Sequence, residues 1–181
     1  MKIEIVSSSP RQESITIRLA YHLKRKLTEE TNHEIGLLDM REIRMPMIEK
    51  VFSTPDKAPD EFKHAAERVF AAQAFIIVTP EYNGSYSPAM KNFFDHFPKQ
   101  MHKAFGIATA SDGIMGGIRA SQQVQLLING LFGIGSPSML ITPQVDKKFD
   151  EQGNLLDESF QNKVSTFLTE FLWLAERIAA S

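Results

Sequence analysis

Residues 75–88 read FIIVTPEYNGSYSP, an apolar run followed by a loop with two prolines and one glycine. This pattern is typical of a rigid loop at the carboxyl end of a buried strand. Open α/β sheets bind their ligands at such loops. An ordinary strand-to-helix turn is the alternative interpretation, and the rest of the chain is needed to choose between the two.

The composition indicates a globular protein and excludes several classes of function. The chain has 181 residues, 43% of them hydrophobic, which suits a single domain (1–181) with a substantial core. A net charge of -2 argues against nucleic acid or an anionic membrane surface as a partner, because both require clustered positive charge. The absence of cysteine excludes disulfides, thiolate metal sites and cysteine nucleophiles, and is compatible with a cytoplasmic location. We expect neither a signal peptide nor a membrane span.

Strand patterns and helix patterns alternate along the chain. Short apolar runs predict five strands, at residues 2–6, 33–38, 74–79, 104–110 and 138–142. Apolar residues at helical spacing predict five helices, at residues 15–30, 61–72, 88–97, 120–131 and 160–178. The alternation implies a parallel sheet covered on both faces. Right-handed crossovers then bring the carboxyl ends of the strands, and the loops 7–14, 79–88 and 111–117, to one edge.

The first of these loops has the composition of an anion site. It holds three serines in a row, Arg11, and Ser14 beside the start of a helix. Unsatisfied N–H groups and the positive end of the helix dipole attract anions there, and a guanidinium matches the geometry of a phosphate. The alternative is that Ser14 only caps the helix and Arg11 is solvated. The loop matches neither a P-loop nor a G-x-G-x-x-G dinucleotide motif.

The other two loops suit a flat heterocycle. Tyr82 and Asn83 bring an aromatic ring, an amide and peptide N–H groups held by flanking prolines. The loop at 111–117 contains three glycines, which would allow a planar ring to approach the backbone closely. A phosphate at one loop and a flat ring between the others together describe a mononucleotide such as FMN.

Hydrolytic and metal-dependent chemistry finds no support in the motifs. The chain contains no G-x-S-x-G elbow, and its five histidines lack a metal-binding spacing. A position near the site is one interpretation of His96 and His102, but we expect both on the surface. The acidic residues Asp146, Asp150 and Glu151 resemble a calcium loop only loosely, because other residues interrupt the ligand positions, and we reject that interpretation.

Three segments resemble the NADPH-dependent FMN reductase family, which includes quinone, azo-dye and chromate reductases. They are SSPRQESIT at 8–16, PEYNGS at 80–85 with Lys91-Asn92 downstream, and SDGIMGG at 111–117 followed by Arg119-Ala120. The likeness runs in order from the first strand to about Leu131. It implies a flavodoxin-like three-layer α/β sandwich with a five-stranded parallel sheet in the order 2-1-3-4-5 and helices on both faces.

The resemblance also assigns residues to the cofactor. It implies that the FMN phosphate is held by Ser8, Arg11, Ser14 and Thr16. It places the ribityl chain and the ring between two sets of residues, Pro80, Glu81, Tyr82 and Asn83 on one side and Ser111, Gly113, Gly116 and Gly117 on the other. Two positions depart from the family pattern: Ser7-Ser8 stands where Gly-Ser is common, and His96 stands where a tryptophan often follows the aspartate.

The implied activity is an FMN-dependent oxidoreductase with two half-reactions. Hydride passes from NADPH or NADH to flavin N5, and a quinone, azo compound, free flavin or similar small acceptor then takes both electrons. Backbone N–H groups around 82–85 or 111–117 would stabilise negative charge at N1 and the C2 carbonyl, so no side chain need act as an acid. A flavodoxin-type electron carrier and a module that has lost its flavin are the alternatives.

Relatives in this family are usually assemblies of identical subunits, which implies a homodimer or homotetramer. Phe93, Phe94 and Phe97 follow the second loop. They are candidates for a dimer surface, with ordinary core packing as the alternative.

Overall fold

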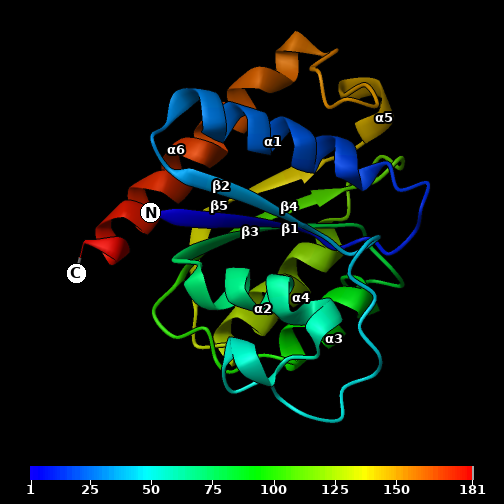
Figure 1. Cartoon of the computed structure of the whole chain (residues 1–181). Helices are drawn as coiled ribbons and strands as arrows, with labels where there is room; N and C mark the ends of the chain where they lie inside the picture. Colours follow the sequence, from blue (N-terminus) through cyan, green and yellow to red (C-terminus); the bar gives the residue numbers. More distant parts are fainter. Residues whose placement is uncertain (181) are drawn as a thin grey trace.

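The computed structural model describes residues 1–180 and contains one parallel sheet between two layers of helices (Figure 1). The strands are β1 (Lys2–Ser7), β2 (Glu34–Asp39), β3 (Ala74–Thr79), β4 (Ala104–Ala110) and β5 (Ile134–Thr142). Their order is β2-β1-β3-β4-β5, which confirms the expected flavodoxin-like sheet. In Figure 1 the carboxyl ends of the strands lie on the right, so the loops that leave them gather at that edge.

The helices divide between the two faces of the sheet. The helices α1 (Thr16–Glu30) and α6 (Gln161–Ala179) cover one face, and α2 (Asp60–Ala71), α3 (Pro88–Asp95) and α4 (Ile118–Gly130) cover the other (Figure 1). A single turn, α5 (Val145–Lys148), lies in the connection from β5 to α6. Short 3₁₀ turns occupy Pro55–Lys57 and Glu158–Phe160. None of the helices within residues 1–180 is long and apolar enough to cross a membrane.

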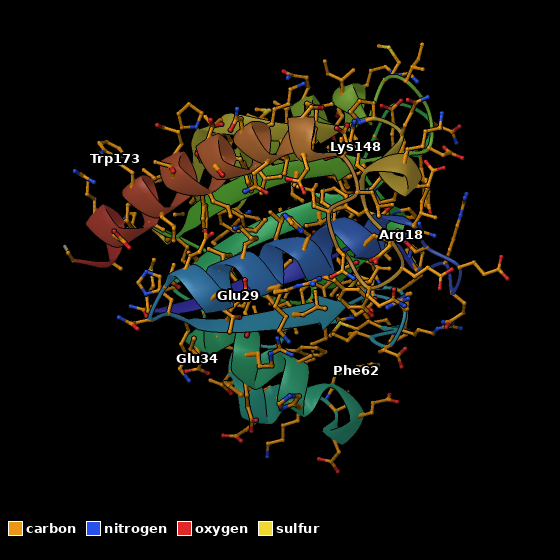
Figure 2. All side chains as sticks on the ribbon, turned by 90° about the horizontal axis from the view of Figure 1, so that it is seen from above. Arg18, Glu29, Glu34, Phe62, Lys148 and Trp173 are labelled. Carbon is orange, nitrogen blue, oxygen red and sulfur yellow. The ribbon has the colours of Figure 1, made fainter. Side chains whose placement is uncertain are left out.

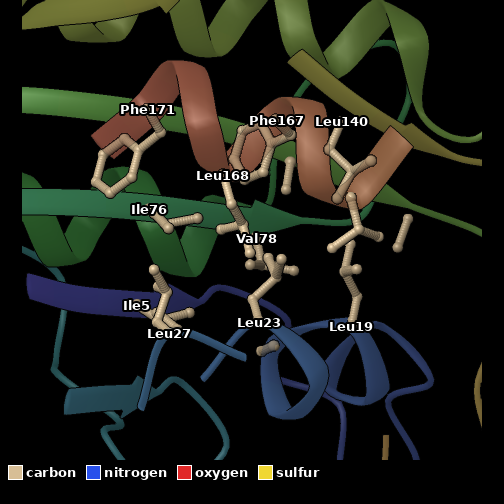
Figure 3. Close-up of a cluster of buried hydrophobic side chains, with 14 of the residues drawn as sticks. Ile5, Leu19, Leu23, Leu27, Ile76, Val78, Leu140, Phe167, Leu168 and Phe171 are labelled. Atoms are coloured by element: carbon tan, nitrogen blue, oxygen red, sulfur yellow. The ribbon is translucent and has the colours of Figure 1, made fainter. Parts of the chain in front are cut away.

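The central strands are apolar because helices cover both of their faces. Every residue of β3 and β4 is buried. Figure 3 shows the layer under α1 and α6, where Leu19 and Leu23 of α1 and Phe167 of α6 approach Ile76 and Val78 of β3. Burial of one such side chain contributes about 1.5–3 kcal/mol. This packing fixes the start of α1 at the edge where the loops meet.

Strand β5 begins four residues earlier than the sequence predicts, at Ile134 instead of Ser138. The extra residues include Gly135 and Pro137, which are typical of a turn. As the edge strand, β5 tolerates both residues, and its pairing with β4 shifts between Phe105 and Ile107.

The aromatic residues at the end of α3 are core residues, and the dimer surface expected there is wrong. Phe93, Phe94 and Phe97 are at most 4% exposed. The expectation of a surface position for His96 is also wrong, because it is 3% exposed, its ring centroid lies 5.1 Å from that of Phe52, and its Nδ1 lies 2.8 Å from the carbonyl oxygen of Asn92. Apolar residues on several sides of this short helix reflect its burial between the sheet and its neighbours.

Candidate flavin site

A cavity of about 260 Å³ opens where three loops meet: loop 1 (8–15) after β1, loop 2 (80–87) after β3 and loop 3 (111–117) after β4. The residues that were expected at the cofactor and that line it are Arg11, Ser14, Thr16, Pro80, Glu81, Tyr82 and Ser111. Larger cavities exist, including one of about 440 Å³ between β5 and α6 and one of about 620 Å³ that shares Glu13, Ser14 and Ile15 with this cavity. The cavity where the three loops meet is distinguished by the hydroxyls of Ser14 and Tyr82, both of which lack a hydrogen-bond partner among the described residues.

The start of α1 presents donors without acceptors. Ile15 is the N-cap of this helix and makes no side-chain capping bond, so the interpretation of Ser14 as the cap is wrong. The Ser14 hydroxyl is buried and has no hydrogen-bond partner among the described residues. Because the first N–H groups of a helix also lack intrahelical acceptors, this end of α1 is suited to bind an anion.

Arg11 lies across the cavity mouth from loop 1 to loop 2. Its guanidinium carbon is 4.7 Å from the ring centroid of Tyr82, a cation–π contact that holds the two loops together. Arg11 is exposed and forms no ion pair with a carboxylate anywhere in residues 1–180. The Tyr82 hydroxyl is buried without a partner in the described part of the chain. The cavity therefore offers a free positive charge and a free hydroxyl.

Loop 2 contains a tight turn at Asn83-Gly84. The N–H of Tyr82 donates to the oxygen of Ser85 at 2.8 Å, and the N–H of Ser85 donates to the oxygen of Tyr82 at 3.1 Å. Asn83 and Gly84 have φ angles of 53° and 83°, as a type I′ turn requires. The turn therefore uses the N–H groups of Tyr82 and Ser85, whereas those of Asn83 and Gly84 have no protein acceptor within the described residues.

Ser87 joins loop 2 to loop 1. Its hydroxyl donates to the carbonyl oxygen of Ser8 and accepts from the N–H of Met90 at 3.2 Å, which caps α3. Ser87 is fully buried, so both bonds are shielded from water. Next to it, burial raises the pKa of the Tyr86 hydroxyl and keeps that side chain neutral. The proline after Ser87 starts the helix, and together these features fix the end of loop 2.

Glu81 joins loop 2 to the start of α4. Its carboxylate accepts from the N–H of Arg119 at 3.2 Å and from Nε at 2.6 Å, and it forms an ion pair with the Arg119 guanidinium. The Glu81 side chain is 10% exposed. Although Glu81 borders the cavity, its charge is thus directed at α4.

Gly116 and Gly117 of loop 3 are required by the backbone conformation and by close packing. A Cβ on Gly116 would lie 2.7 Å from the nitrogen of Pro143, and its φ is 60°. Gly117 is the N-cap of α4, with a φ of 82°. Neither residue lines the cavity. The structure explains both glycines by close packing and helix initiation, and it does not support the expected room for a ring beside them.

Several predicted residues lie outside the cavity lining: Ser8, Asn83, Gly113, Gly116 and Gly117. The hydroxyl of Ser8 is buried behind the loop, and its N–H donates to the oxygen of Val78. Ser9 lines the cavity in its place. Neither residue of the Ser7-Ser8 departure from the family pattern lines this cavity.

Five lining residues were not predicted from the sequence to hold the cofactor: Ser9, Glu13, Ile15, Ala110 and Asp112. Ser9 belongs to the segment SSPRQESIT at 8–16, but a run of three serines does not show where the strand ends. Asp112 was part of the predicted loop without an assigned role. Glu13 and Ile15 are the chain neighbours of Ser14 and Thr16, which were assigned to the phosphate.

Known proteins of similar sequence identify the family of this chain. The family model of NADPH-dependent FMN reductase matches residues 1–144. The FMN-dependent NADPH-azoreductase of Staphylococcus aureus is 30% identical over 182 residues, which cover 95% of this chain and 94% of that protein.

Solved structures show the same fold at lower identity. FerB, a flavoenzyme NAD(P)H:(acceptor) oxidoreductase from Paracoccus denitrificans, has a TM-score of 0.79 and 21% identity, with 97% of each chain covered. A flavodoxin mutant from Pseudomonas aeruginosa has a TM-score of 0.57 and 19% identity, with 94% of this chain and 99% of that chain covered. The chain belongs to the NADPH-dependent FMN reductase family and is an oxidoreductase that uses FMN and a reduced nicotinamide.

Proposed function

We propose that the cavity between loops 1, 2 and 3 binds FMN within a single flavin-binding domain. The phosphate would be held by Ser9, Arg11, Ser14 and Thr16 together with the free N–H groups at the start of α1. The observation that carries this assignment is the buried Ser14 hydroxyl, which has no partner among the described residues and lies at an uncapped helix start. A bound phosphate would satisfy these donors and pair with Arg11.

Loops 2 and 3 would hold the rest of the cofactor. Pro80, Tyr82 and Ser111 line the cavity, and Asn83 offers a free backbone N–H beside it. FMN supplies the electron chemistry between a reduced nicotinamide and an acceptor. The chain contributes fixed N–H dipoles, which stabilise negative charge without reorganisation during the reaction. The Glu81 carboxylate is engaged by Arg119, and we assign no proton transfer to it.

We propose that the acceptor is a small molecule of the quinone, azo or free flavin type. The azo class is supported by the name of the Staphylococcus aureus relative. The test is consumption of NADPH and NADH by the FMN-loaded protein with one acceptor of each class. Oxidation of the nicotinamide with at least one acceptor is expected. If no acceptor supports it, the protein is an FMN electron carrier, and a colourless protein that does not take up FMN contradicts both interpretations.

We also propose a homodimer or homotetramer in the cytoplasm, where reduced nicotinamides are produced. Support for self-association comes from exposed apolar side chains that run from loop 3 along α4. They are Ile114, Met115, Ile118 and Leu126, each more than 40% exposed. A monomeric mass by light scattering at micromolar concentration would contradict the assembly.

A further inference from the structure

The contact between Glu81 and Arg119 joins two of the three loops that form the cavity. Glu81 is the second residue of loop 2, and Arg119 is the second residue of α4, directly after loop 3. The two residues are 38 positions apart in the chain. Their contact is the one side-chain hydrogen-bonded link between loop 2 and the loop 3–α4 segment among the described residues.

This link has two parts with different chemistry. One Glu81 oxygen accepts from the backbone N–H of Arg119, which caps the first turn of α4 because Gly117 has no side chain to do so. The other oxygen accepts from the guanidinium, which brings the opposite charge to a carboxylate that is only 10% exposed. The Arg119 side chain is 72% exposed, so the body of the protein does not need it for packing.

We propose that Arg119 is a positioning residue for the flavin. Through Glu81 it holds loop 2 against the start of α4, so that the free N–H groups of Asn83 and Gly84 in loop 2 keep one orientation, in which they stabilise the negative charge of the reduced ring. The pair therefore raises the reduction potential of bound FMN. This inference rests on the assignment of the cavity as the FMN site.

A direct effect of charge on the reduction potential is the competing explanation. The two explanations predict opposite changes in potential when Glu81 is removed. Removal of Arg119 lowers the potential in both cases, because it removes a positive charge and also releases the loop. Removal of Glu81 removes a negative charge, which raises the potential by charge alone. If the pair acts by positioning, Glu81→Ala lowers the potential instead.

The experiment measures the midpoint potential of the FMN-loaded protein in wild type, Arg119→Ala, Glu81→Ala and the double variant. We expect each variant to weaken binding of reduced FMN about tenfold more than binding of oxidised FMN, which lowers the two-electron potential by about 30 mV. The double variant should match the single variants, because both remove the same contact. A higher or unchanged potential in Glu81→Ala, or a wild-type potential in the double variant, would overturn the proposal.

Two further variants separate geometry from charge and from general destabilisation. Arg119→Lys keeps the charge but loses the planar fork, so we expect a partial decrease; the wild-type potential would count against positioning. Arg177→Ala is the matched control. The Arg177 guanidinium lies 4.1 Å from the ring centroid of Trp173, which Figure 2 places at the end of the molecule opposite Arg18. The midpoint potential of FMN in the Arg177→Ala variant should equal that in the wild type.

Hydrogen exchange in the ligand-free protein distinguishes a failure of this inference from a failure of the FMN assignment. Arg119→Ala should speed exchange of the backbone amide at position 119 and of the amides of loop 2, whereas Arg177→Ala should not. Unchanged exchange would contradict positioning even if FMN binds. A wild-type protein that does not bind FMN would contradict the assignment of the site, while faster exchange would still support the link between the loops.

Discussion

Two segments contact α1, and they differ in how their polar groups are satisfied. Loop 1 carries the Ser14 hydroxyl without a partner and Arg11 without a carboxylate among the described residues. Segment 149–157, which follows α5, bonds to α1 at several points. Arg18 donates to the oxygen of Phe149 at 3.1 Å, and His22 Nδ1 lies 3.0 Å from the oxygen of Gly153.

Segment 149–157 also satisfies its own polar groups. Asp150 accepts from the backbone N–H groups of Gln152 and Asn154 at 3.0 and 2.7 Å. The side-chain amide of Asn154 also donates to Asp150, and this bond is the main reason why the pKa of that carboxyl is lowered. Buried polar groups normally have partners. The Nε2 of His22 is also buried without a partner among the described residues, so the satisfaction of polar groups against α1 is not complete there. The bonds of segment 149–157 nevertheless indicate that it serves stability, whereas loop 1 leaves a hydroxyl and a guanidinium available to a ligand.

Gly153 places segment 149–157 against α1, so its substitution should reduce stability more than the other substitutions described below. Gly153 has a φ of +77°, and a Cβ there would lie 2.7 Å from the oxygen of Arg18 and 2.8 Å from the nitrogen of His22. Gly153→Ala should reduce the free energy of unfolding by about 2–4 kcal/mol, from the left-handed backbone and overpacking together. Urea denaturation measures this loss.

Gly130→Ala is the control for that measurement. Gly130 ends α4, and a Cβ there meets no atom within 4 Å. The change should leave stability unchanged or raise it by about 0.5–1 kcal/mol. Equal stability of the Gly153→Ala protein and the wild type would show that segment 149–157 is not fixed on α1.

Ser87 and Ser14 both have buried hydroxyls, but only the hydroxyl of Ser87 has hydrogen-bond partners among the described residues. Ser87→Ala should cost about 1–2 kcal/mol of stability, because the hydroxyl caps α3 and bonds to Ser8. Ser14→Ala should leave stability within about 0.5 kcal/mol, because that hydroxyl has no partner to lose among the described residues.

The effects of the two substitutions on FMN binding should be the reverse of their effects on stability. Ser14→Ala should weaken FMN binding by about 1 kcal/mol, the typical net value of one hydrogen bond. Fluorescence titration measures this change, and denaturation measures stability. A Ser14→Ala protein that is destabilised as much as Ser87→Ala would mean that Ser14 serves the fold.

The smallest effect concerns pH. His22 is 6% exposed, and burial lowers its pKa below the ordinary value of 6.5; Arg25 and Lys26 also lower it, while the bond to Gly153 and the charge of Glu30 oppose the shift. The unfolded chain therefore binds a proton at a higher pH than the folded chain. Stability should fall as the pH drops through about 6.5.

Denaturation at pH 7.5 and at pH 5.5 tests the role of His22. His22→Gln should remove part of the pH dependence, and His64→Gln, at an exposed position on α2, should retain it. Identical pH dependence in wild type and His22→Gln would contradict the assignment.

The sequence predicts the elements of the central sheet well. Strands β3 and β4 have the predicted bounds, because each is a fully buried apolar run between polar loops. The position of β5 was predicted less well, because an edge strand accepts residues that elsewhere signal a turn.

The contacts that shape the site were not predictable from local patterns. Glu81 and Arg119 are 38 positions apart, and Ser87 and Ser8 are 79 positions apart. Periodicity reports which face of an element is buried, and it carries no information on which side chains meet across loops. The choice between Ser8 and Ser9 likewise depends on the residue at which β1 ends.

Paired titrations with FMN and riboflavin test whether loop 1 and the start of α1 bind the phosphate of FMN. Riboflavin lacks the phosphate but keeps the ring. Arg11→Ala should weaken FMN binding by about 1.5–3 kcal/mol, the range for hydrogen bonds to a charged group, and should change riboflavin binding much less. Equal losses for both ligands, or no loss for FMN, would contradict the claim.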